Sequence, residues 1–168
     1  IPIDPFYLTW KAREYEHNTR FIELAGEINT AMPDYVIGKV SGALNDQKKS
    51  INGSKILILG LAYKPNVDDD RESPSYILLE KLQAKGAEVA YYDPHVPVIP
   101  MTREHAHWAG TESIDWEQNE LESFDSVVIA TQHAAVDYGQ LADWCHSIVD
   151  TRNAMAGIET KDGQVIKA

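Results

Sequence analysis

Apolar positions in the first part of the chain recur with the period of an α-helix. Between residues 7 and 44 they fall three or four positions apart, so that each group lies on one face of a helix. The two groups are Phe21, Leu24, Ala25 and Ile28, and Val36, Ile37, Val40 and Leu44. Pro33 separates them, and we expect it to start a new helix or to kink a long one. Helices of this length cannot bury such faces by themselves, so we expect another domain or another subunit to cover them.

Short aliphatic runs replace this period after residue 53, and amphipathic segments separate them. Residues 55–59 are almost wholly aliphatic and precede Gly60, as in a parallel strand buried on both faces. Ser73 and Pro74 then have the residue types of a helix N-cap and first turn. The further elements that the pattern predicts are a helix over 74–85, strands over 88–92, 126–130, 147–149 and 164–167, a short helix over 138–144, and irregular structure with one short helix over 94–122.

The alternation of strand, helix and strand predicts an α/β fold with a parallel sheet, because such crossovers are right-handed. A polar stretch over residues 45–53 separates the helical part from the sheet. We therefore expect a helical segment over 1–50 and a parallel-sheet domain over 51–168. A chain of 168 residues with 43% hydrophobic content is long enough and apolar enough to bury a core.

The charge and the cysteine content exclude several classes of partner. The formal net charge is −11, so nucleic acid and anionic membrane surfaces repel the chain at long range. Any anionic ligand must therefore meet a local group of cations. The single cysteine, Cys145, excludes an internal disulfide and is expected to be a small buried side chain rather than a nucleophile. The chain has no signal-like or transmembrane-length apolar stretch, and we expect a cytoplasmic protein.

Two cations follow the first predicted strand, where open α/β sheets bind their ligands. Lys64 and Arg71 lie in the loop before the helix, and both can donate charge-assisted hydrogen bonds to a pyrophosphate. An equal alternative is a pair of solvated surface cations, balanced by the carboxylates at positions 68, 69, 70 and 72. Three consecutive carboxylates cannot all reach one ion without a specialised loop, so we predict no metal site there.

Three further strand ends carry polar residues. Arg152 follows the fourth predicted strand and is expected near Lys64, although an exposed turn arginine fits the sequence as well. His133 occupies the equivalent place after the third strand, and Asp93 ends the second. An acid at that place is typical of ribose binding, but the G-x-G-x-x-G series is absent from the sequence. We therefore do not expect this half of the chain to hold the pyrophosphate of NAD by itself.

Other candidate residues have plain structural interpretations. Asp4 and Pro5 suit the N-cap and first turn of the first helix, and a carboxylate so placed can also steer a proton. His95, His105 and His107 match no standard metal spacing and come with no cysteine, so we interpret them as surface residues.

Five short stretches make the chain resemble the UDP-glucose/GDP-mannose dehydrogenase family, and most of all the branch that acts on UDP-N-acetylhexosamines. Together they span nearly the whole chain in matching order, and they are IPIDPFYL at 1–8, GLAYK at 60–64, DRES at 70–73, YDP at 92–94 and DTRN at 150–153. Members of this family have an N-terminal Rossmann domain for NAD, a long central helix that forms the dimer, and a C-terminal Rossmann-like domain that binds UDP. The chain resembles the last two. The resemblance implies a homodimer through a helical dimerisation segment over 1–50, and a Rossmann-like UDP-binding domain over 51–168.

The resemblance also implies the reaction of the parent protein. Such enzymes oxidise the 6-hydroxyl of a UDP-sugar to a carboxylate in two hydride transfers to NAD, through a cysteine that carries a thiohemiacetal and then a thioester. Their uronate products serve polysaccharide biosynthesis. In that pattern the cysteine stands immediately before the residue that matches Ile1, and the chain contains neither it nor the glycine-rich NAD loop. We therefore expect a fragment that is inactive alone, with NAD bound mainly by the N-terminal domain.

By position, the resemblance assigns roles to individual residues. Asp4 resembles the carboxylate that assists the active-site water and the proton transfers. Tyr63 and Lys64 resemble contacts to the nucleotide sugar, and Arg152 resembles the arginine that contacts the substrate. Arg71 resembles the residue that reaches NAD from this domain. The competing hypothesis is a stand-alone nucleotide-binding or regulatory module with a helical dimerisation arm; a phosphoacceptor domain is set aside, because a lysine rather than acids follows the first strand.

Overall fold

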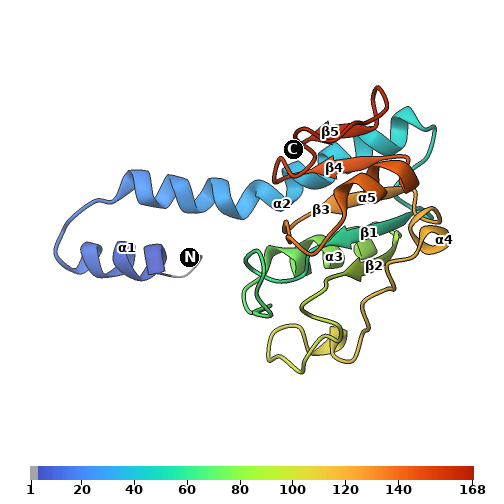
Figure 1. Cartoon of the computed structure of the whole chain (residues 1–168). Helices are drawn as coiled ribbons and strands as arrows, with labels where there is room; N and C mark the ends of the chain where they lie inside the picture. The colour runs from blue at the N-terminus through green and yellow to red at the C-terminus, as the bar shows by residue number, and fades with distance from the viewer. Residues whose placement is uncertain (1–3) are drawn as a thin grey trace. The chain divides into compact units, whose positions relative to one another are not determined.

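The computed structural model describes residues 4–168 (Figure 1). Its elements are α1 (Asp4–Glu14), α2 (Arg20–Asp46), β1 (Lys55–Leu59), α3 (Pro74–Ala84), β2 (Glu88–Tyr92), the 3-10 helix η1 (Ala106–Trp108), α4 (Gln118–Leu121), β3 (Ser126–Ile129), α5 (Tyr138–Trp144), β4 (Ile148–Asp150) and β5 (Val165–Lys167). By its internal contacts the chain divides into two compact units, Ile1–Tyr35 and Val36–Ala168. The functional boundary at residue 50 stays a prediction.

The second unit is built on a parallel sheet, as the sequence predicts. Within the described residues the sheet has five strands in the order β2-β1-β3-β4-β5, and each neighbouring pair is parallel. The chain passes from β1 to β2 on one side and then returns to place β3 on the other side of β1. The topological switch point therefore lies between β1 and β3, and open α/β sheets bind ligands at the carboxyl ends of the strands at this point.

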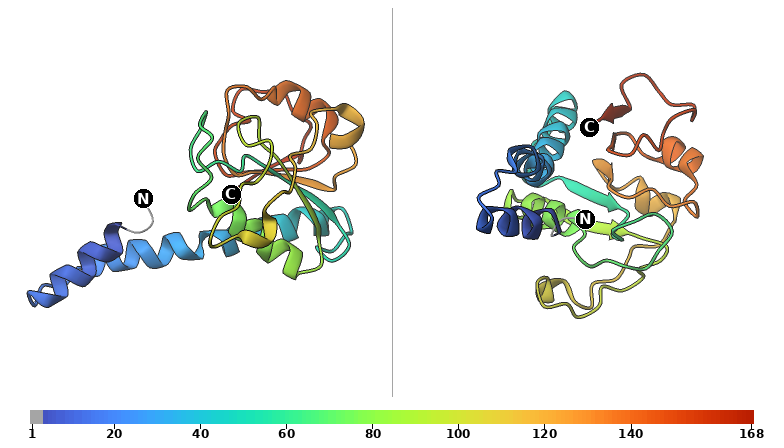
Figure 2. Two further views of the ribbon diagram at one scale, coloured as in Figure 1. Left: turned by 90° about the horizontal axis from the view of Figure 1, so that it is seen from below. Right: turned by 90° about the vertical axis from the view of Figure 1, so that its left-hand side faces the viewer.

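Apolar residues of the second unit form two layers, one on each face of the sheet. Along β1, Ile56 and Ile58 point to one layer and Leu57 and Leu59 to the other, and all four are fully buried. The first layer contains residues from the last turns of α2 and from α3, and the second contains residues from α4 and α5 (Figure 2). This is the sandwich of helices around a parallel sheet that continuous aliphatic strands require.

The helix α2 contains Pro33 in its interior, so one of the two outcomes expected of this proline is excluded. It runs without interruption from Arg20 to Asp46, so Pro33 does not start a new helix. Beyond this point the predicted stripe of Val36, Ile37 and Val40 packs into the first layer of the sheet core. The sheet of the same chain is therefore the domain that covers this half of the helical pattern.

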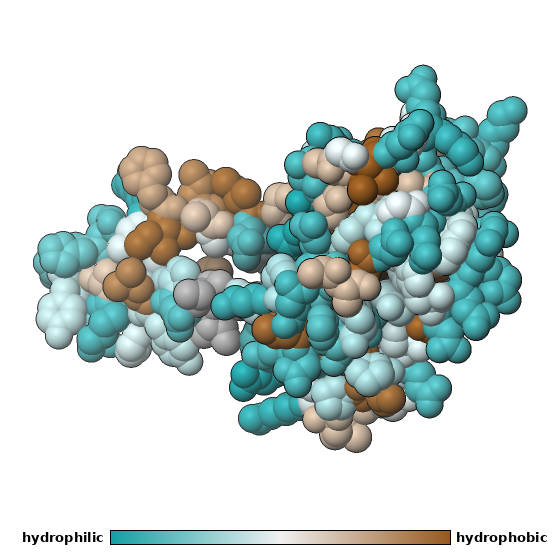
Figure 3. Space-filling view, in the orientation of Figure 1, coloured by the Kyte–Doolittle hydropathy of each residue, from teal (hydrophilic) through white to brown (hydrophobic). Residues whose placement is uncertain are grey.

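The first unit consists of α1 and the first half of α2. Phe6 packs against Gly26, where an added Cβ would lie 2.8 Å from the Phe6 ring, and Arg13 pairs with Glu23 at 3.0 Å. Many large apolar side chains of this unit are exposed; they are Phe6, Tyr7, Leu8, Trp10, Tyr15, Phe21, Leu24, Ile28, Met32 and Tyr35 (Figure 3). Together these side chains make a larger exposed apolar set than a solvated surface needs.

The remaining predicted elements appear with small differences. The strand β4 is shifted by one residue from its predicted place, and residues 94–122 contain η1 and α4 rather than one short helix. The strand β5 is the predicted edge strand. No helix within residues 4–168 has both the length and the apolar character needed to cross a bilayer.

Candidate functional site

The loops at the carboxyl ends of the strands carry most of the predicted site residues. Because all neighbouring strands are parallel, the loops after β1, β2, β3 and β4 leave the same edge of the sheet. Tyr63, Lys64 and Arg71 lie in the loop after β1, and Arg152 follows β4. The structure thus places these four residues at one edge of the second unit.

The root of the loop after β1 is fastened by Asp93 at the end of β2. Its Oδ2 accepts hydrogen bonds from the backbone N–H groups of Leu61 at 2.7 Å and Ala62 at 2.8 Å. Its Oδ1 accepts from the N–H groups of His95 at 2.8 Å and Val96 at 3.2 Å. Asp93 is 1% exposed, so its carboxylate ties two loops together and is not presented to a ribose.

The charge of Asp93 is stabilised by these donors. Burial alone raises the pKa of Asp93, but the contact with the His133 imidazole and the hydrogen bonds from the N–H groups of Ala62 and His95 outweigh it and hold the pKa below its usual value. The carboxylate is therefore ionised at neutral pH despite its burial.

A histidine and an asparagine join the loop after β1 to the loop after β3. His133 is fully buried, and its Nδ1 accepts a hydrogen bond from the N–H of Asn66 at 3.1 Å, while its Nε2 lies 3.1 Å from Oδ2 of Asp93. The side chain of Asn66 makes a second bond between the loops: its Oδ1 accepts a hydrogen bond from the N–H of Ala134 at 2.7 Å. Asn66 has φ 61°, a left-handed conformation that asparagine adopts more readily than most residues.

The loops after β1 and β3 also approach each other closely at Gly60 and Thr131. Gly60 has φ 90°, and a Cβ there would lie 2.3 Å from the backbone oxygen of Thr131. Thr131 donates from Oγ1 to the backbone oxygen of Ala62 at 2.7 Å, and Ser75 donates from Oγ to that of Gly60 at 2.8 Å. Only glycine fits at position 60, because any side chain would clash with Thr131.

The far end of the loop is fixed by a buried pair. Asp70, 5% exposed, accepts a hydrogen bond from the hydroxyl of Tyr76 on α3. Burial, and then this bond, raise the pKa of Tyr76. The N–H of Tyr63 donates to the backbone oxygen of Asp69 at 2.7 Å and closes the loop on itself, and Ser73 caps α3 as predicted. The loop is therefore held at its root, its middle and its end.

The predicted cations sit on this fixed frame. Lys64 is exposed, with Nζ 5.6 Å from the centroid of the Tyr63 ring. Arg152 is exposed, and its Nε donates to the backbone oxygen of Ala130, the residue after β3, at 2.6 Å. Both cations thus belong to loops that are bonded to the loop after β3.

Arg71 is engaged differently. Its Nε and one terminal nitrogen donate to the two carboxylate oxygens of Asp69, each at 2.8 Å. These bonds lower the pKa of Asp69 to about 2. The pair is exposed to solvent, where such pairs exchange partners at little cost. Arg71 can therefore turn to another anion only by leaving Asp69.

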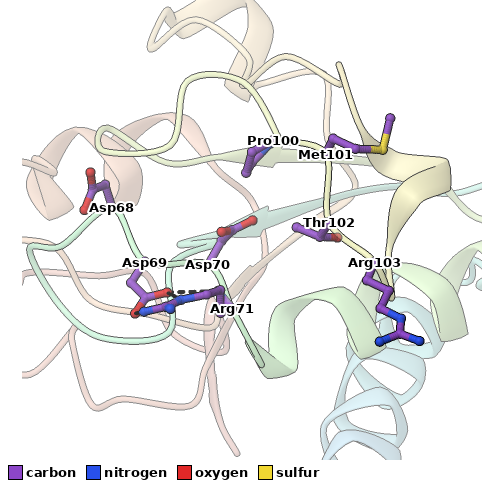
Figure 4. A pocket seen from close by; sticks show the side chains of 8 residues that line it. All are labelled: Asp68, Asp69, Asp70, Arg71, Pro100, Met101, Thr102 and Arg103. Carbon is purple, nitrogen blue, oxygen red and sulfur yellow. Dashed lines mark hydrogen bonds and ion pairs between the residues drawn. The ribbon is translucent and has the colours of Figure 1, made fainter.

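A hollow of about 610 Å³ lies beside Arg71 (Figure 4). It is lined by Asp68, Asp69, Asp70, Arg71, Pro100, Met101, Thr102 and Arg103. Lys64 and Arg152 are not part of this lining. The hollow is therefore not the space between these two cations.

Asp4 is the first residue of α1 and is exposed. It belongs to the first unit, whereas the other four predicted site residues belong to the second. Residues 1–3, which begin the first matching stretch of the sequence, lie outside the described residues. The catalytic role of Asp4 stays a prediction.

Two secondary predictions have clear outcomes. Cys145 is 2% exposed, and burial raises the pKa of its thiol to about 12, so it is a buried apolar residue as expected. The interpretation of all three histidines as surface residues is wrong for His95, whose Nε2 is buried, and for His105. The ring of His105 is mostly buried, stacks on Tyr76 with centroids 4.2 Å apart, and contacts Glu80 through Nδ1 at 2.9 Å.

The part of the chain that forms the loops at the carboxyl ends of the strands matches a family model. Residues 57–157 match the UDP binding domain of the UDP-glucose/GDP-mannose dehydrogenase family. The match begins within β1 and ends within the loop after β4, so it includes Tyr63, Lys64, Arg71 and Arg152.

Individual proteins give the same result. The chain is 43% identical over 95 residues to a UDP-N-acetyl-D-mannosamine dehydrogenase of Methanococcus maripaludis. The aligned residues make up 56% of this chain and 21% of the relative. Its structure is similar to that of UDP-D-ManNAc dehydrogenase from Pyrococcus horikoshii, with a TM-score of 0.78 and 26% identity over 99% of this chain and 37% of the other. It is also similar to NDP-N-acetyl-D-galactosaminuronic acid dehydrogenase from Methanosarcina mazei Go1, with a TM-score of 0.71 and 28% identity over 88% of this chain and 30% of the other. The chain thus spans well under half the length of each.

Proposed function

The chain belongs to the UDP-glucose/GDP-mannose dehydrogenase family, and from this premise we propose that residues 51–168 bind the UDP moiety of a nucleotide sugar. The observation that carries the proposal is the position of Lys64 and Arg152 on loops that are both bonded to the loop after β3. An anion at the switch point between β1 and β3 then meets two cations on a frame that is already ordered.

The chemistry of the two cations suits a diphosphate. The Lys64 ammonium is a compact charge on a flexible stem, and the Arg152 guanidinium offers a planar fork that can bind two phosphate oxygens. In a chain with a net charge of −11, such a local pair is needed to offset long-range repulsion of the ligand. Tyr63, next to Lys64, would contact the nucleotide or the sugar.

We propose that the parent protein is an NAD-dependent 6-dehydrogenase of a UDP-hexose or UDP-N-acetylhexosamine. The relative from Methanococcus maripaludis is named a UDP-N-acetyl-D-mannosamine dehydrogenase, which supports the second substrate class. NAD would supply the hydride acceptor, bound mainly by a domain outside this chain. Within the chain, Asp4 would assist the water and proton transfers, and Arg71 would reach the cofactor after releasing Asp69.

We also propose that residues 1–50 pair two copies of the chain. The exposed apolar side chains of the first unit, such as Phe21 at 89% and Ile28 at 56% exposure, support this assignment. A second copy would remove this large exposed apolar set from water.

Calorimetric titration of the chain with UDP, and separately with uridine, tests the proposal. UDP is expected to bind weakly but saturably, and uridine at least tenfold more weakly, because the two cations act on the diphosphate. Equal binding of both ligands, or none of UDP, would contradict it. Mixed with a UDP-sugar and NAD, the chain alone is expected to produce no NADH.

A further inference from the structure

We propose that His133 is a positioning residue for the loop that carries Lys64, and that it acts through the hydrogen bond between its Nδ1 and the backbone N–H of Asn66. The inference rests on the proposed binding of UDP at this loop and adds a buried residue to it. His133 is 0% exposed, so it cannot touch a ligand in this structure, and its effect must pass through the residues that it contacts.

The contacts of His133 fix its tautomer and its orientation. Because Nδ1 accepts a hydrogen bond from Asn66, it presents a lone pair, and the ring N–H of this tautomer is on Nε2. Nε2 lies 3.1 Å from Oδ2 of Asp93 without hydrogen-bond geometry, and that oxygen accepts from Leu61 and Ala62. The ring is therefore held between the root of the loop and its middle, with one nitrogen facing each.

Lys64 lies between the two fixed points. The N–H groups of Leu61 and Ala62 are bonded to Asp93 on one side, and Asn66 is bonded to His133 and Ala134 on the other. The backbone of residues 63–65 must bridge these points, so the starting position of the Lys64 side chain is set before a ligand arrives. A loop that is already ordered loses less conformational entropy on binding.

Of the two hydrogen bonds that hold Asn66, one uses its backbone and the other uses its side chain. The bond from Ala134 uses Oδ1 of the Asn66 side chain, whereas the bond to His133 uses the backbone N–H, which every residue except proline has. Removing the acceptor at position 133 therefore leaves a backbone N–H without its partner, and no change of rotamer at Asn66 can replace it.

Two substitutions at position 133 distinguish the contact of Nδ1 with Asn66 from the contact of Nε2 with Asp93. In His133→Asn the amide oxygen can take the place of Nδ1 and accept from Asn66, but nothing reaches Asp93. In His133→Gln the NH₂ group of the longer amide can take the place of Nε2 beside Asp93, but its oxygen then lies beyond the position of Nδ1 and away from the Asn66 N–H. His146→Gln, at an exposed position remote in sequence from the loop contacts, is the matched control.

Hydrogen exchange of residues 61–71 and UDP affinity are measured for each variant. We expect His133→Gln to speed exchange at the Asn66 amide at least tenfold and to weaken UDP binding about five- to tenfold, with a smaller loss in His133→Asn. Asn66→Gly, which keeps the left-handed backbone and removes only the bond from Ala134, is expected to weaken binding about threefold and serves if the Gln variant folds poorly. His146→Gln is expected to change neither quantity.

A cycle with Lys64→Ala distinguishes positioning from general stability. If His133 acts through the position of Lys64, His133→Gln adds little to the loss of UDP affinity caused by Lys64→Ala. The inference is overturned if the fold-losses of UDP affinity in His133→Gln and Lys64→Ala multiply fully in the double variant. It is also overturned if the Asn and Gln variants lose equal affinity, or if hydrogen exchange at the Asn66 amide is unchanged in the Gln variant. If the unmodified chain does not bind UDP, the proposed function fails, and the exchange rates alone decide whether His133 orders the loop.

Discussion

Arg152 donates a hydrogen bond from Nε to the backbone oxygen of Ala130 at 2.6 Å. This bond lays the guanidinium across the carboxyl end of β3, the strand beside β1, while Asp150 accepts from the backbone N–H of Arg152 at 2.9 Å. Among the described residues, the two terminal nitrogens of Arg152 make no hydrogen bond. The side chain is thus anchored by one nitrogen and can offer the other two to a ligand.

Arg152→Lys is expected to weaken UDP binding about tenfold although the charge is kept, because lysine has neither the Nε–H anchor nor the planar fork. Titration calorimetry measures the effect. Arg103→Lys, an exposed arginine at the hollow beside Arg71, is the matched control and is expected to leave the affinity unchanged. Equal affinities of the Arg152→Lys variant and the unmodified chain would show that Arg152 is only a turn residue.

Asp93→Asn is expected to lower the free energy of unfolding by about 3 kcal/mol, because the amide NH₂ faces backbone N–H donors that lose their acceptor. Denaturant unfolding at neutral pH measures this change. Asp143→Asn, an exposed aspartate on α5, is expected to change the stability by less than about 0.5 kcal/mol.

The cost of Asp93→Asn is expected to depend on pH. The folded pKa of Asp93 is below that of an unfolded aspartate, so its contribution is complete above the unfolded value of about 4 and is lost as the pH falls through the lower folded pKa. The difference in the free energy of unfolding between the unmodified chain and the Asn variant should therefore become smaller below about pH 4. A difference that grows on acidification would contradict the ionised, buried carboxylate.

Gly60→Ala is expected to destabilise the chain by about 3 kcal/mol or more, because the new Cβ meets the backbone oxygen of Thr131 in addition to the strain of a positive φ. Gly157→Ala is the matched control, since Gly157 has φ 82° but no atom within 4 Å of an added Cβ. It should cost only the backbone strain, about 1 kcal/mol. Similar losses in the two variants, measured by denaturant unfolding, would show that the loops after β1 and β3 are not packed as described.

Phe21→Glu is expected to convert a dimer into a monomer, because it puts a charge into the exposed apolar set of the first unit. Analytical ultracentrifugation measures the association. Met101→Glu, at a residue of the second unit that is 78% exposed, is the control and should leave the dimer intact. A chain that is monomeric at high concentration without either substitution would refute the proposed pairing of two copies.

Much of the second unit could be predicted from local pattern. The aliphatic run over 55–59, the Ser73 cap and the short helix over 138–144 are each decided by residues that are neighbours in sequence, and the structure contains them at the expected places. Pro33 shows where such rules leave two outcomes open. A proline removes one helical hydrogen bond, but here α2 continues through it and its next turns are buried against the sheet.

The frame of the candidate site could not be predicted in the same way. His133 and Asn66 are 67 residues apart, and their bond exists only because β1 and β3 are neighbours in the sheet. The sequence offers one signal, an asparagine after proline in a loop, and a second, a histidine in the loop that follows a buried strand. Neither signal predicts that Asn66 and His133 are in contact. The place of Asp93 at a strand end is likewise visible in the sequence, but its four backbone donors come from two different loops.

The central claim, that Lys64 and Arg152 act together on one diphosphate, is tested by UDP affinity in a double-mutant cycle. Calorimetry on the unmodified chain, Lys64→Ala, Arg152→Ala and the double variant should show at least a tenfold loss for each single substitution and a combined loss smaller than their product, while Lys161→Ala stays at the affinity of the unmodified chain. Unchanged affinity in either single variant, or the same loss in the Lys161→Ala control, would contradict the account.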